Sequence, residues 1–401
     1  MINWLFLNNF LYKIYSFYSM KILKKLLKWS IVALALFLCY VIGCLLHGTA
    51  TDFQPEEKIA LPIKDNTQAS IITKNRLTFL NWNVGYGGLG AKSNFFYDDG
   101  NPFFFSNGKM VRSPKSYVEE NIAGISAFIA AHPADFVLLQ EVDYQSKRSY
   151  FINQHEQYLA QLPNYNAHFA VNYKVQRVVI PVCEPWQVMG KMESGLSSYA
   201  KYQAHKSTRY QFPGSYGWPD YIFHLDRCLS VQRYQTAHPD GKELIVVNTH
   251  NSAYDGGTLK NDEMAYFKQL VLAEYNKGNY VVVGGDWNQT PPKLPFDAAS
   301  KAVGIPTDST YNPANIAPDF MPEGWQWAFD PTVPTNRQVI DILEYGKTAV
   351  SLVDFYLVSP NISIKKVEGK NLKFAYSDHN PILLEIELQG LDSLNNSTNE
   401  L

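Results

Sequence analysis

The stretch "VVVGGDWNQTP" (Val281–Pro291) decides the fold, because an apolar run ends there in a polar turn. Three consecutive valines predict a buried strand, and the glycines and polar residues that follow predict its end. Asp286 and Asn288 suit a turn, because both side chains hydrogen-bond to nearby backbone and tolerate unusual dihedral angles. The same two side chains also have the chemistry of half an active site, and Trp287 between them is expected to point the opposite way and pack.

Five other apolar runs end in polar residues in a similar way. With the first, the predicted strands are Arg76–Asn83, Asp135–Asp143, Glu243–His250, Tyr280–Asn288, Ser351–Ser359 and Pro381–Leu388. Helical spacing of apolar residues at 113–132 and 259–278 predicts helices between some of them, the first capped by Ser113 and Pro114. This mixture over about 330 residues predicts one layered α/β domain.

Two long segments, Ala91–Arg112 and Pro163–Pro219, do not follow this alternation. Both are rich in aromatic residues, Gly and Pro. Long irregular segments in a compact domain are usually functional loops or disordered, and the aromatic content argues against disorder. We therefore expect two functional loops, and a disordered tail only at residues 391–401.

The N-terminal fifty residues differ from the rest. A lysine cluster ending at Lys28 precedes the uncharged apolar run Trp29–Leu46, which is close to the shortest length that spans a membrane. Lysines before the span stay in the cytoplasm, so the domain after it is expected outside. Met20 is an alternative start, because the residues after it have the form of a signal n-region.

Two forms of membrane attachment remain open. The motif "VIGC" (Val41–Cys44) resembles a bacterial lipobox, in which Cys44 would carry the lipid. The run stays apolar through Leu46, which suits an uncleaved signal anchor at least as well. Residues 51–75 read as a linker and residues 76–390 as the domain. The protein is expected to be anchored either in the bacterial inner membrane, with its domain facing the periplasm, or as a lipoprotein.

The charge of the domain limits its partners. The chain has 35 basic and 37 acidic residues, and five of the basic ones lie in residues 1–50, which leaves a formal charge of −7 beyond them. Tight sequence-independent binding to nucleic acid depends on many Lys and Arg side chains that release counterions. The domain has no obvious footprint of that kind, and no protein partner is indicated.

The domain contains only two cysteines, Cys183 and Cys228. They either pair, in an oxidising compartment, or remain two separate thiols, and spacing does not decide. Neither belongs to a CxxC motif of a zinc or redox site.

The polar residues at the ends of the predicted strands share one chemistry. They are Asn83, Glu141, Asn248, His250, Asp286, Asn288, Asp354, Asp378 and His379. Carboxylates, amides and imidazoles without thiols favour a hard divalent cation such as Mg²⁺. Such repetition at separate strand ends indicates a shared site rather than independent turns.

The motifs "NWNVG", "LLQEVD", "VNTHNS", "GGDWN", "LVDFYLVS" and "YSDHNPI" occur in this order between Leu77 and Leu388. Through these motifs the chain resembles the metal-dependent endonuclease/exonuclease/phosphatase superfamily. That superfamily includes deoxyribonuclease I, apurinic endonucleases, bacterial sphingomyelinases and inositol polyphosphate 5-phosphatases. The resemblance implies a four-layer α/β/β/α sandwich of two mainly antiparallel or mixed sheets flanked by helices, with the active site at one edge.

The resemblance also implies a metal-binding side of the site. Glu141 is the expected principal Mg²⁺ ligand, Asn83 supports the metal or phosphate, and Asp378 faces the metal. Mn²⁺ and Ca²⁺ are alternatives to Mg²⁺. Some relatives carry an Asp two residues after the asparagine that matches Asn83, where this chain has Gly85. This departure argues against an apurinic-type enzyme.

The catalytic roles are implied in the same way. Asp286 orients or deprotonates the attacking water, and Asn288 donates to a phosphate oxygen. His379 hydrogen-bonds to the phosphoryl group while Asp354 holds its other ring nitrogen, and His250 is the candidate acid for the leaving oxygen. Weaker assignments to substrate binding are Asn248, Arg227, Arg337 and, similarly, Tyr199.

The predicted function is a membrane-tethered, Mg²⁺-dependent phosphoesterase in which water attacks phosphorus in line. Its substrate is a nucleic acid, a lipid head group or a small phosphorylated compound. A catalytically inactive binding or scaffold module on the same fold is the alternative. The phenylalanines of "NFFYDDGNPFFF" (Asn94–Phe105) either dip into a membrane or pack, and packing is favoured.

Overall fold

The computed structural model describes residues 2–64, 69–100, 103–253, 258–295, 297–305, 311 and 313–391. The chain divides into two compact units, Met1–Thr51 and Asp52–Leu401. The predicted disordered tail lies outside the described residues, except for Leu391.

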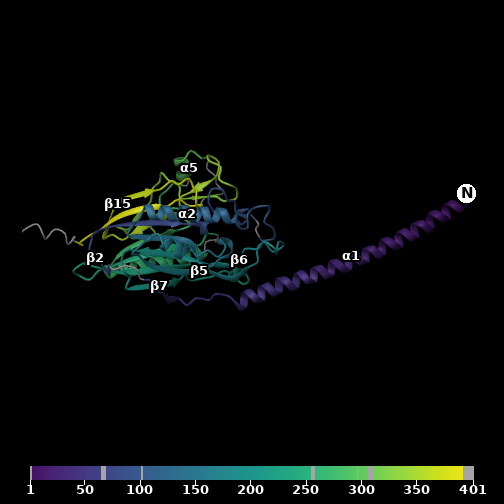
Figure 1. Cartoon of the computed structure of the whole chain (residues 1–401), viewed down its shortest axis with the longest axis horizontal. Helices are drawn as coiled ribbons and strands as arrows, with labels where there is room; N and C mark the ends of the chain where they lie inside the picture. The colour runs from purple at the N-terminus through teal and green to yellow at the C-terminus, as the bar shows by residue number, and fades with distance from the viewer. Residues whose placement is uncertain are drawn as a thin grey trace, which may run out of the picture. The chain divides into compact units, whose positions relative to one another are not determined.

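The first unit is one continuous helix, α1 (Ile2–Ala50), drawn in purple in Figure 1. Its part from Met20 to Ala50 is long and apolar enough to cross a membrane, and an 18-residue window within it has a mean hydropathy of 2.5. None of that stretch is buried inside the protein, so it does not serve as a core helix. A membrane anchor and a signal sequence both have this form.

The second unit contains two large sheets. The first has the order β1 (Lys58–Ala60), β7 (Lys206–Gln211), β8 (Cys228–Thr236), β9 (Glu243–His250), β10 (Tyr280–Asp286), β14 (Asp354–Val358) and β11 (Gln326–Ala328), with β2 (Ile71–Ile72) paired to β8. The second has the order β15 (Ile362–Gly369), β16 (Ile382–Leu388), β3 (Arg76–Asn83), β4 (Phe136–Asp143), β6 (Gly190–Ala200) and β5 (Asn166–Val178). A small ladder joins β12 (Asn336–Arg337) to β13 (Val350–Ser351).

The layers follow from the alternation of side chains along each strand. Inward residues such as Phe79, Leu138 and Val282 form the core between the sheets. Outward residues of β3 and β4 pack with α2 (Lys115–Ala131) and α3 (Gln154–Leu159), and Figure 1 shows α2 lying across strands of the domain. Outward residues of β10 pack with α4 (Thr258–Asn276) and α5 (Ala298–Ala302). The predicted four-layer sandwich is confirmed.

The six predicted strands are present as β3, β4, β9, β10, β14 and β16. Their register builds the site. Asp286 lies opposite His250 on the parallel neighbour β9 and opposite Asp354 on the antiparallel neighbour β14. Three polar residues that are far apart in the sequence therefore meet at one edge of the sheet.

The prediction that Pro163–Pro219 is an irregular loop is wrong for most of its length. The segment forms β5, β6 and β7, and β5 and β6 pair at the edge of the second sheet. Buried polar residues such as His168 and Ser197 replace the apolar runs that mark the other strands. Tertiary pairing rather than strand propensity therefore defines these strands.

The loop Ala91–Arg112 contains, among its described residues, only the short helix η2 (Phe96–Asp98). Phe96 is buried, in line with the packing prediction, whereas the side chains of Phe103, Phe104 and Phe105 are 47–52% exposed. The packing prediction is therefore wrong for those three residues.

The structure also bears on three smaller expectations. The predicted linker 51–75 contributes β1, which pairs with β7, and β2, which pairs with β8. The cap of α2 is not the predicted one, because Ser113 Oγ donates to the Gly88 carbonyl at 2.6 Å and the N-cap residue Pro114 makes no side-chain bond. Within the described part of the chain, Cys183 and Cys228 are free thiols.

Candidate active site

The segment Val281–Pro291 contains a turn and also contributes side chains to the candidate active site. Asp286 Oδ1 accepts the backbone N–H of Asn288 at 2.9 Å, and Oδ2 accepts from Asn83 Nδ2 at 3.0 Å. Asn288 has a φ of +49° and donates its side-chain N–H to the Asn251 carbonyl at 2.8 Å. Trp287 is fully buried and stacks on Phe355 with ring centroids 5.2 Å apart, so its predicted packing is confirmed.

The two glycines before Asp286 allow close approach, but to protein rather than to a ligand. A Cβ on Gly285 would lie 2.1 Å from the Thr249 carbonyl oxygen on β9. A Cβ on Gly284 would lie 2.8 Å from the Tyr356 ring on β14. The glycines therefore hold the strands that carry His250 and Asp354 against β10.

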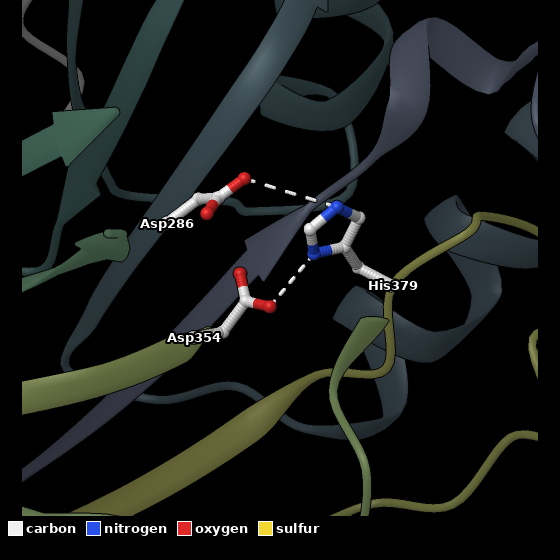
Figure 2. A group of neighbouring side chains, drawn as sticks. All are labelled: Asp286, Asp354 and His379. Carbon is white, nitrogen blue, oxygen red and sulfur yellow. Dashed lines mark hydrogen bonds and ion pairs between the residues drawn. The ribbon is translucent and has the colours of Figure 1, made fainter. Parts of the chain in front are cut away.

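Asp354 and His379 form a buried pair, which Figure 2 shows beside Asp286. His379 Nδ1 lies 2.7 Å from Asp354 Oδ2, and its Nε2 lies 3.8 Å from Asp286 Oδ2. Burial alone would lower the pKa of His379, but the carboxylates of Asp354 and Asp378 outweigh it and raise the pKa to about 10. The ring is therefore an imidazolium at neutral pH, with one N–H held and the other facing Asp286.

Asp354 is itself held by a residue that no motif marked. Thr335 Oγ1 accepts the backbone N–H groups of Val353 and Asp354 at 2.9 and 3.0 Å. Burial raises the pKa of Asp354 to about 6 against the opposing charge of His379. Among the described residues its Oδ1 is buried without a hydrogen-bond partner, so this carboxylate is committed to His379.

Glu141 occupies an irregular position in β4. The register of β4 against β6 shifts between Leu139 and Val142, and Glu141 has a φ of +54°. A bulge of this kind redirects a side chain, and the Glu141 side chain is 24% exposed while the rest of the strand is buried. Asn83 Nδ2 lies 3.2 Å from Glu141 Oε1 and also binds Asp286, so the Asn83 amide links the two carboxylates.

Asp378 lies in the space beside Gly85, the position at which some relatives carry an Asp. A Cβ on Gly85 would lie 2.5 Å from Asp378 Oδ1. Burial raises the pKa of Asp378 to about 7, and the nearby charge of Glu141 contributes in the same direction. Together with Glu141, whose charge disfavours ionisation of Asp378, this carboxyl group forms a donor pair that suits a hard divalent cation.

Among the described residues, the ligand atoms of another group, formed by Asp286, Asp354 and His379, lie within 4.8 Å of one another. This group fits a metal less well, because an imidazolium has no free lone pair and Nδ1 is already bonded to Asp354. The donor chemistry therefore favours the predicted set around Glu141.

His250 differs from His379 in charge. Its Nε2 lies 3.4 Å from Asp286 Oδ2 and 4.0 Å from Glu141 Oε1. Burial, reinforced by the charges of Arg227 and His379, holds the pKa of His250 well below its usual value. A neutral ring can donate an N–H to Asp286, whereas the predicted role of acid requires a bound proton. That role stays a prediction.

One cleft of about 540 Å³ is lined by Glu141, His250, Asp286, Asn288, Asp378 and His379, while Asn83 and Asp354 lie outside its lining. The family model for the endonuclease/exonuclease/phosphatase family matches residues 80–379, which include all of the residues above. The chain belongs to this family. Its members act on phosphate esters. A search of curated proteins finds no match.

Solved structures of the family resemble this chain at low identity. The endonuclease/exonuclease/phosphatase of Beutenbergia cavernae is 14% identical, with a TM-score of 0.49, and the match covers 79% of this chain and 72% of that one. The protein of the same description from Bacteroides vulgatus is 18% identical, with a TM-score of 0.46 over 79% of this chain and 100% of that one. The human Nocturnin catalytic domain is 15% identical, with a TM-score of 0.47 over 82% and 98%.

The weaker assignments lie in different places. Arg227 lines the cleft and donates to the His250 carbonyl at 3.3 Å. Arg337 also lines it, but its guanidinium donates to backbone carbonyls, three of them in the loop at Leu89, Gly90 and Ser93. The Asn248 amide is buried between the sheets and donates to the Leu139 and Ser197 carbonyls. Tyr199 lies beside His155, to whose carbonyl its hydroxyl donates at 3.0 Å.

Two further polar residues, Arg148 and Asn336, line the cleft and were missed from the sequence. Arg148 is 7% exposed, pairs with Asp143 at 2.9 Å and stacks on the Tyr86 ring, 3.7 Å from its centroid. The Asn336 side-chain amide lies 2.9 Å from His379 Nε2, where its oxygen rather than its N–H group must face a protonated ring. The motif "QEVDYQSKR" places Arg148 seven residues after Glu141, and that proximity was the only signal available.

Proposed function

We propose that this protein hydrolyses a phosphodiester or phosphomonoester by in-line attack of water, with a divalent cation at Glu141 and Asp378. The observation that carries the proposal is the placement of Asp286. Its carboxylate contacts Asn83, neutral His250 and protonated His379 within 3.8 Å. A carboxylate that accepts from the Asn83 side chain and the Asn288 backbone, with two imidazole nitrogens within 3.8 Å, is set up to orient a water molecule beside the cleft.

The roles of this chain's residues follow from charge and position. Asp286 orients the attacking water and accepts its proton. His379, kept protonated by Asp354, donates to the phosphoryl oxygens where negative charge accumulates. Asn288 adds a neutral donor from the same turn, and His250 holds Asp286 in orientation.

Mg²⁺ is the proposed cation, with Mn²⁺ or Ca²⁺ as alternatives. When bound, it neutralises charge on the phosphoryl oxygens and polarises the phosphorus. Glu141 and Asp378 would hold it, and Asn83 would orient Glu141 through the 3.2 Å contact.

We further propose that the helical segment Met20–Ala50 tethers the domain to a membrane, with the catalytic domain outside the cytoplasm. The four lysines at the start of that segment support this orientation. A protease-accessibility assay on intact spheroplasts tests it: the domain is digested in the proposed orientation and is protected in the opposite one.

Metal titration tests the site. The full chain, purified in detergent, is assayed on bis(p-nitrophenyl) phosphate and p-nitrophenyl phosphate over a range of Mg²⁺ concentrations. Glu141→Gln is expected to raise the Mg²⁺ concentration for half-maximal rate about tenfold or more, because one ligand charge is lost. Glu193→Gln, which removes a carboxylate that pairs with Lys174, is the matched control. An unchanged metal dependence in Glu141→Gln contradicts the proposed ligand.

A further inference from the structure

The cleft that contains the site has two chemically different parts. One part consists of the polar residues already described. The rest of the lining includes aromatic and aliphatic side chains: Phe95, Tyr97, Val178, Ile180, Met189 and Leu225. None of these residues belongs to the motifs of the catalytic strands, and they come from β5 and from loops around it.

The apolar part is held in place before any ligand binds. The Phe95 N–H donates to the Val339 carbonyl at 2.7 Å, and the Met189 N–H donates to the Ile180 carbonyl at 3.0 Å. Behind them, buried Phe96 and Met192 belong to the same hydrophobic cluster. Because this surface is supported by packed side chains, it does not depend on collapse around a ligand.

The cations of the cleft are largely committed within the described protein. Arg148 is paired with Asp143, while Arg337, Arg227 and Lys260 donate to backbone carbonyls. Glu141, Asp286 and Asp378 contribute negative charge to the same lining. A single-stranded nucleic acid, with one phosphate per nucleotide, is usually bound by a positively charged groove. The charge of this cleft argues for a substrate with one phosphate group.

The geometry points to the apolar part of the cleft as a subsite for a hydrocarbon substituent of the phosphate ester. The inference rests on the proposed function and adds the substrate class: an ester whose phosphoryl group meets Asp286 and His379 while its alkyl or acyl chain lies against Ile180, Met189 and Leu225. The volume of about 540 Å³ falls in the range of small-molecule sites.

Binding of alkylphosphonates tests the subsite without requiring turnover. Methyl-, propyl- and pentylphosphonate are titrated calorimetrically into the full chain in detergent with Mg²⁺, and titrations into detergent alone are subtracted. Each added methylene is expected to tighten binding about threefold, because it leaves water for an apolar surface. Equal affinities for the three ligands would overturn the inference.

Wall variants separate the subsite from general partitioning. Ile180→Ser and Leu225→Ser are each expected to reduce the gain from methyl to pentyl at least threefold, and either one suffices if the other fails to fold. Ile71→Ser, an exposed position on β2, is the matched control and should keep the full gain. A gain that both wall variants retain would contradict the subsite.

Two further outcomes are informative. Decathymidylate and hexyl phosphate are compared as competitors of bound pentylphosphonate. If decathymidylate displaces it at a lower concentration than hexyl phosphate does, the cleft prefers a polynucleotide and the inference is wrong. Chain-length dependence without hydrolysis of any ester supports the subsite while it refutes the proposed function, so the two failures are distinguishable.

Discussion

At the scale of single residues, a buried carboxylate sets the charge of a buried histidine. His379 and His250 lie on either side of Asp286, yet the pKa of His379 is raised and that of His250 is lowered. Both rings are buried, so burial does not separate them. The difference is Asp354, which contacts His379 at 2.7 Å, while the described residues offer no partner to the buried Nδ1 of His250.

Replacing Asp354 by Asn should therefore change His379 more than it changes the fold. Without the carboxylate the pKa of His379 falls. The native ring keeps its proton at neutral pH, whereas the ring of the variant loses it as pH rises through the lowered pKa. We expect kcat to drop about 10- to 100-fold at pH 8 and less at pH 6. A pH–rate profile beside one for Asp319→Asn, a control at an exposed position, measures this. An unchanged profile would show that Asp354 does not control His379.

A second residue-scale prediction concerns stability. Burial lowers the pKa of His168 to about 3 and that of His155 to about 4. The unfolded chain binds protons at these residues below about pH 6.5 and the folded chain does not. The free energy of unfolding therefore decreases as pH is lowered below about 6.5. The decrease is up to about 1.4 kcal/mol per pH unit for each histidine, and it stops when pH reaches the folded pKa.

His168→Leu removes one of these two contributions. Relative to the native protein, the variant should gain about 2 kcal/mol in unfolding free energy between pH 7 and pH 5, measured by urea denaturation. His205→Leu, at a side chain that is 38% exposed, is the control. A stability difference independent of pH would mean that His168 is protonated in the folded state.

The sequence predicted the chemistry of the site but not all of its residues. Glu141 and Asp286 lie at the ends of apolar runs and His379 lies just before one, so their types and positions were visible. Thr335 and Arg148 lie outside those runs and act by hydrogen-bonding or stacking on residues distant in the sequence. Such contacts exist only after the strands are in register, and no local pattern encodes them.

At the scale of elements, the site depends on the close spacing of β9, β10 and β14. Gly285 touches the Thr249 backbone, and Gly284 touches Tyr356. The valine run predicted β10 well, because its apolar residues are contiguous. The strands β5 to β7 were missed, because small and polar residues such as Ser197 are buried there by pairing with neighbouring strands.

Gly285→Ala tests this spacing. The added Cβ would lie 2.1 Å from a backbone oxygen, which cannot move without separating β9 from β10. We expect a loss of about 3 kcal/mol or more in unfolding free energy. Gly217→Ala, where a Cβ meets nothing within 4 Å, should change stability by less than about 1 kcal/mol. Equal effects of the two substitutions would contradict the packing role of Gly285.

At the scale of the whole molecule, the chain separates an apolar helix from a compact catalytic unit. The boundary lies between Thr51 and Asp52, and the segment after it joins the first sheet through β1. The sequence predicted the apolar segment from its lysine cluster and its uncharged run. It assigned residues 51–75 to a linker, because β1 and β2 are too short to give a periodic pattern.

Deletion of residues 1–51 should leave the domain folded. The described core residues of both sheets lie beyond residue 70. We expect a thermal unfolding midpoint within a few degrees of that of the full chain, and loss of membrane sedimentation. Deletion of residues 1–62, which also removes β1, is the comparison and should lower the midpoint. A domain that unfolds on loss of residues 1–51 would show that α1 contributes to the core.

The most direct test of the account is the rate of Mg²⁺-supported hydrolysis of bis(p-nitrophenyl) phosphate by the full chain and by His379→Ala. The native protein is predicted to hydrolyse the ester, and the variant to lose about 10²-fold or more in kcat/KM while it stays folded. His205→Ala should behave like the native protein. Hydrolysis that survives in His379→Ala, or its absence in the native protein with Mg²⁺, Mn²⁺ and Ca²⁺, would contradict the account.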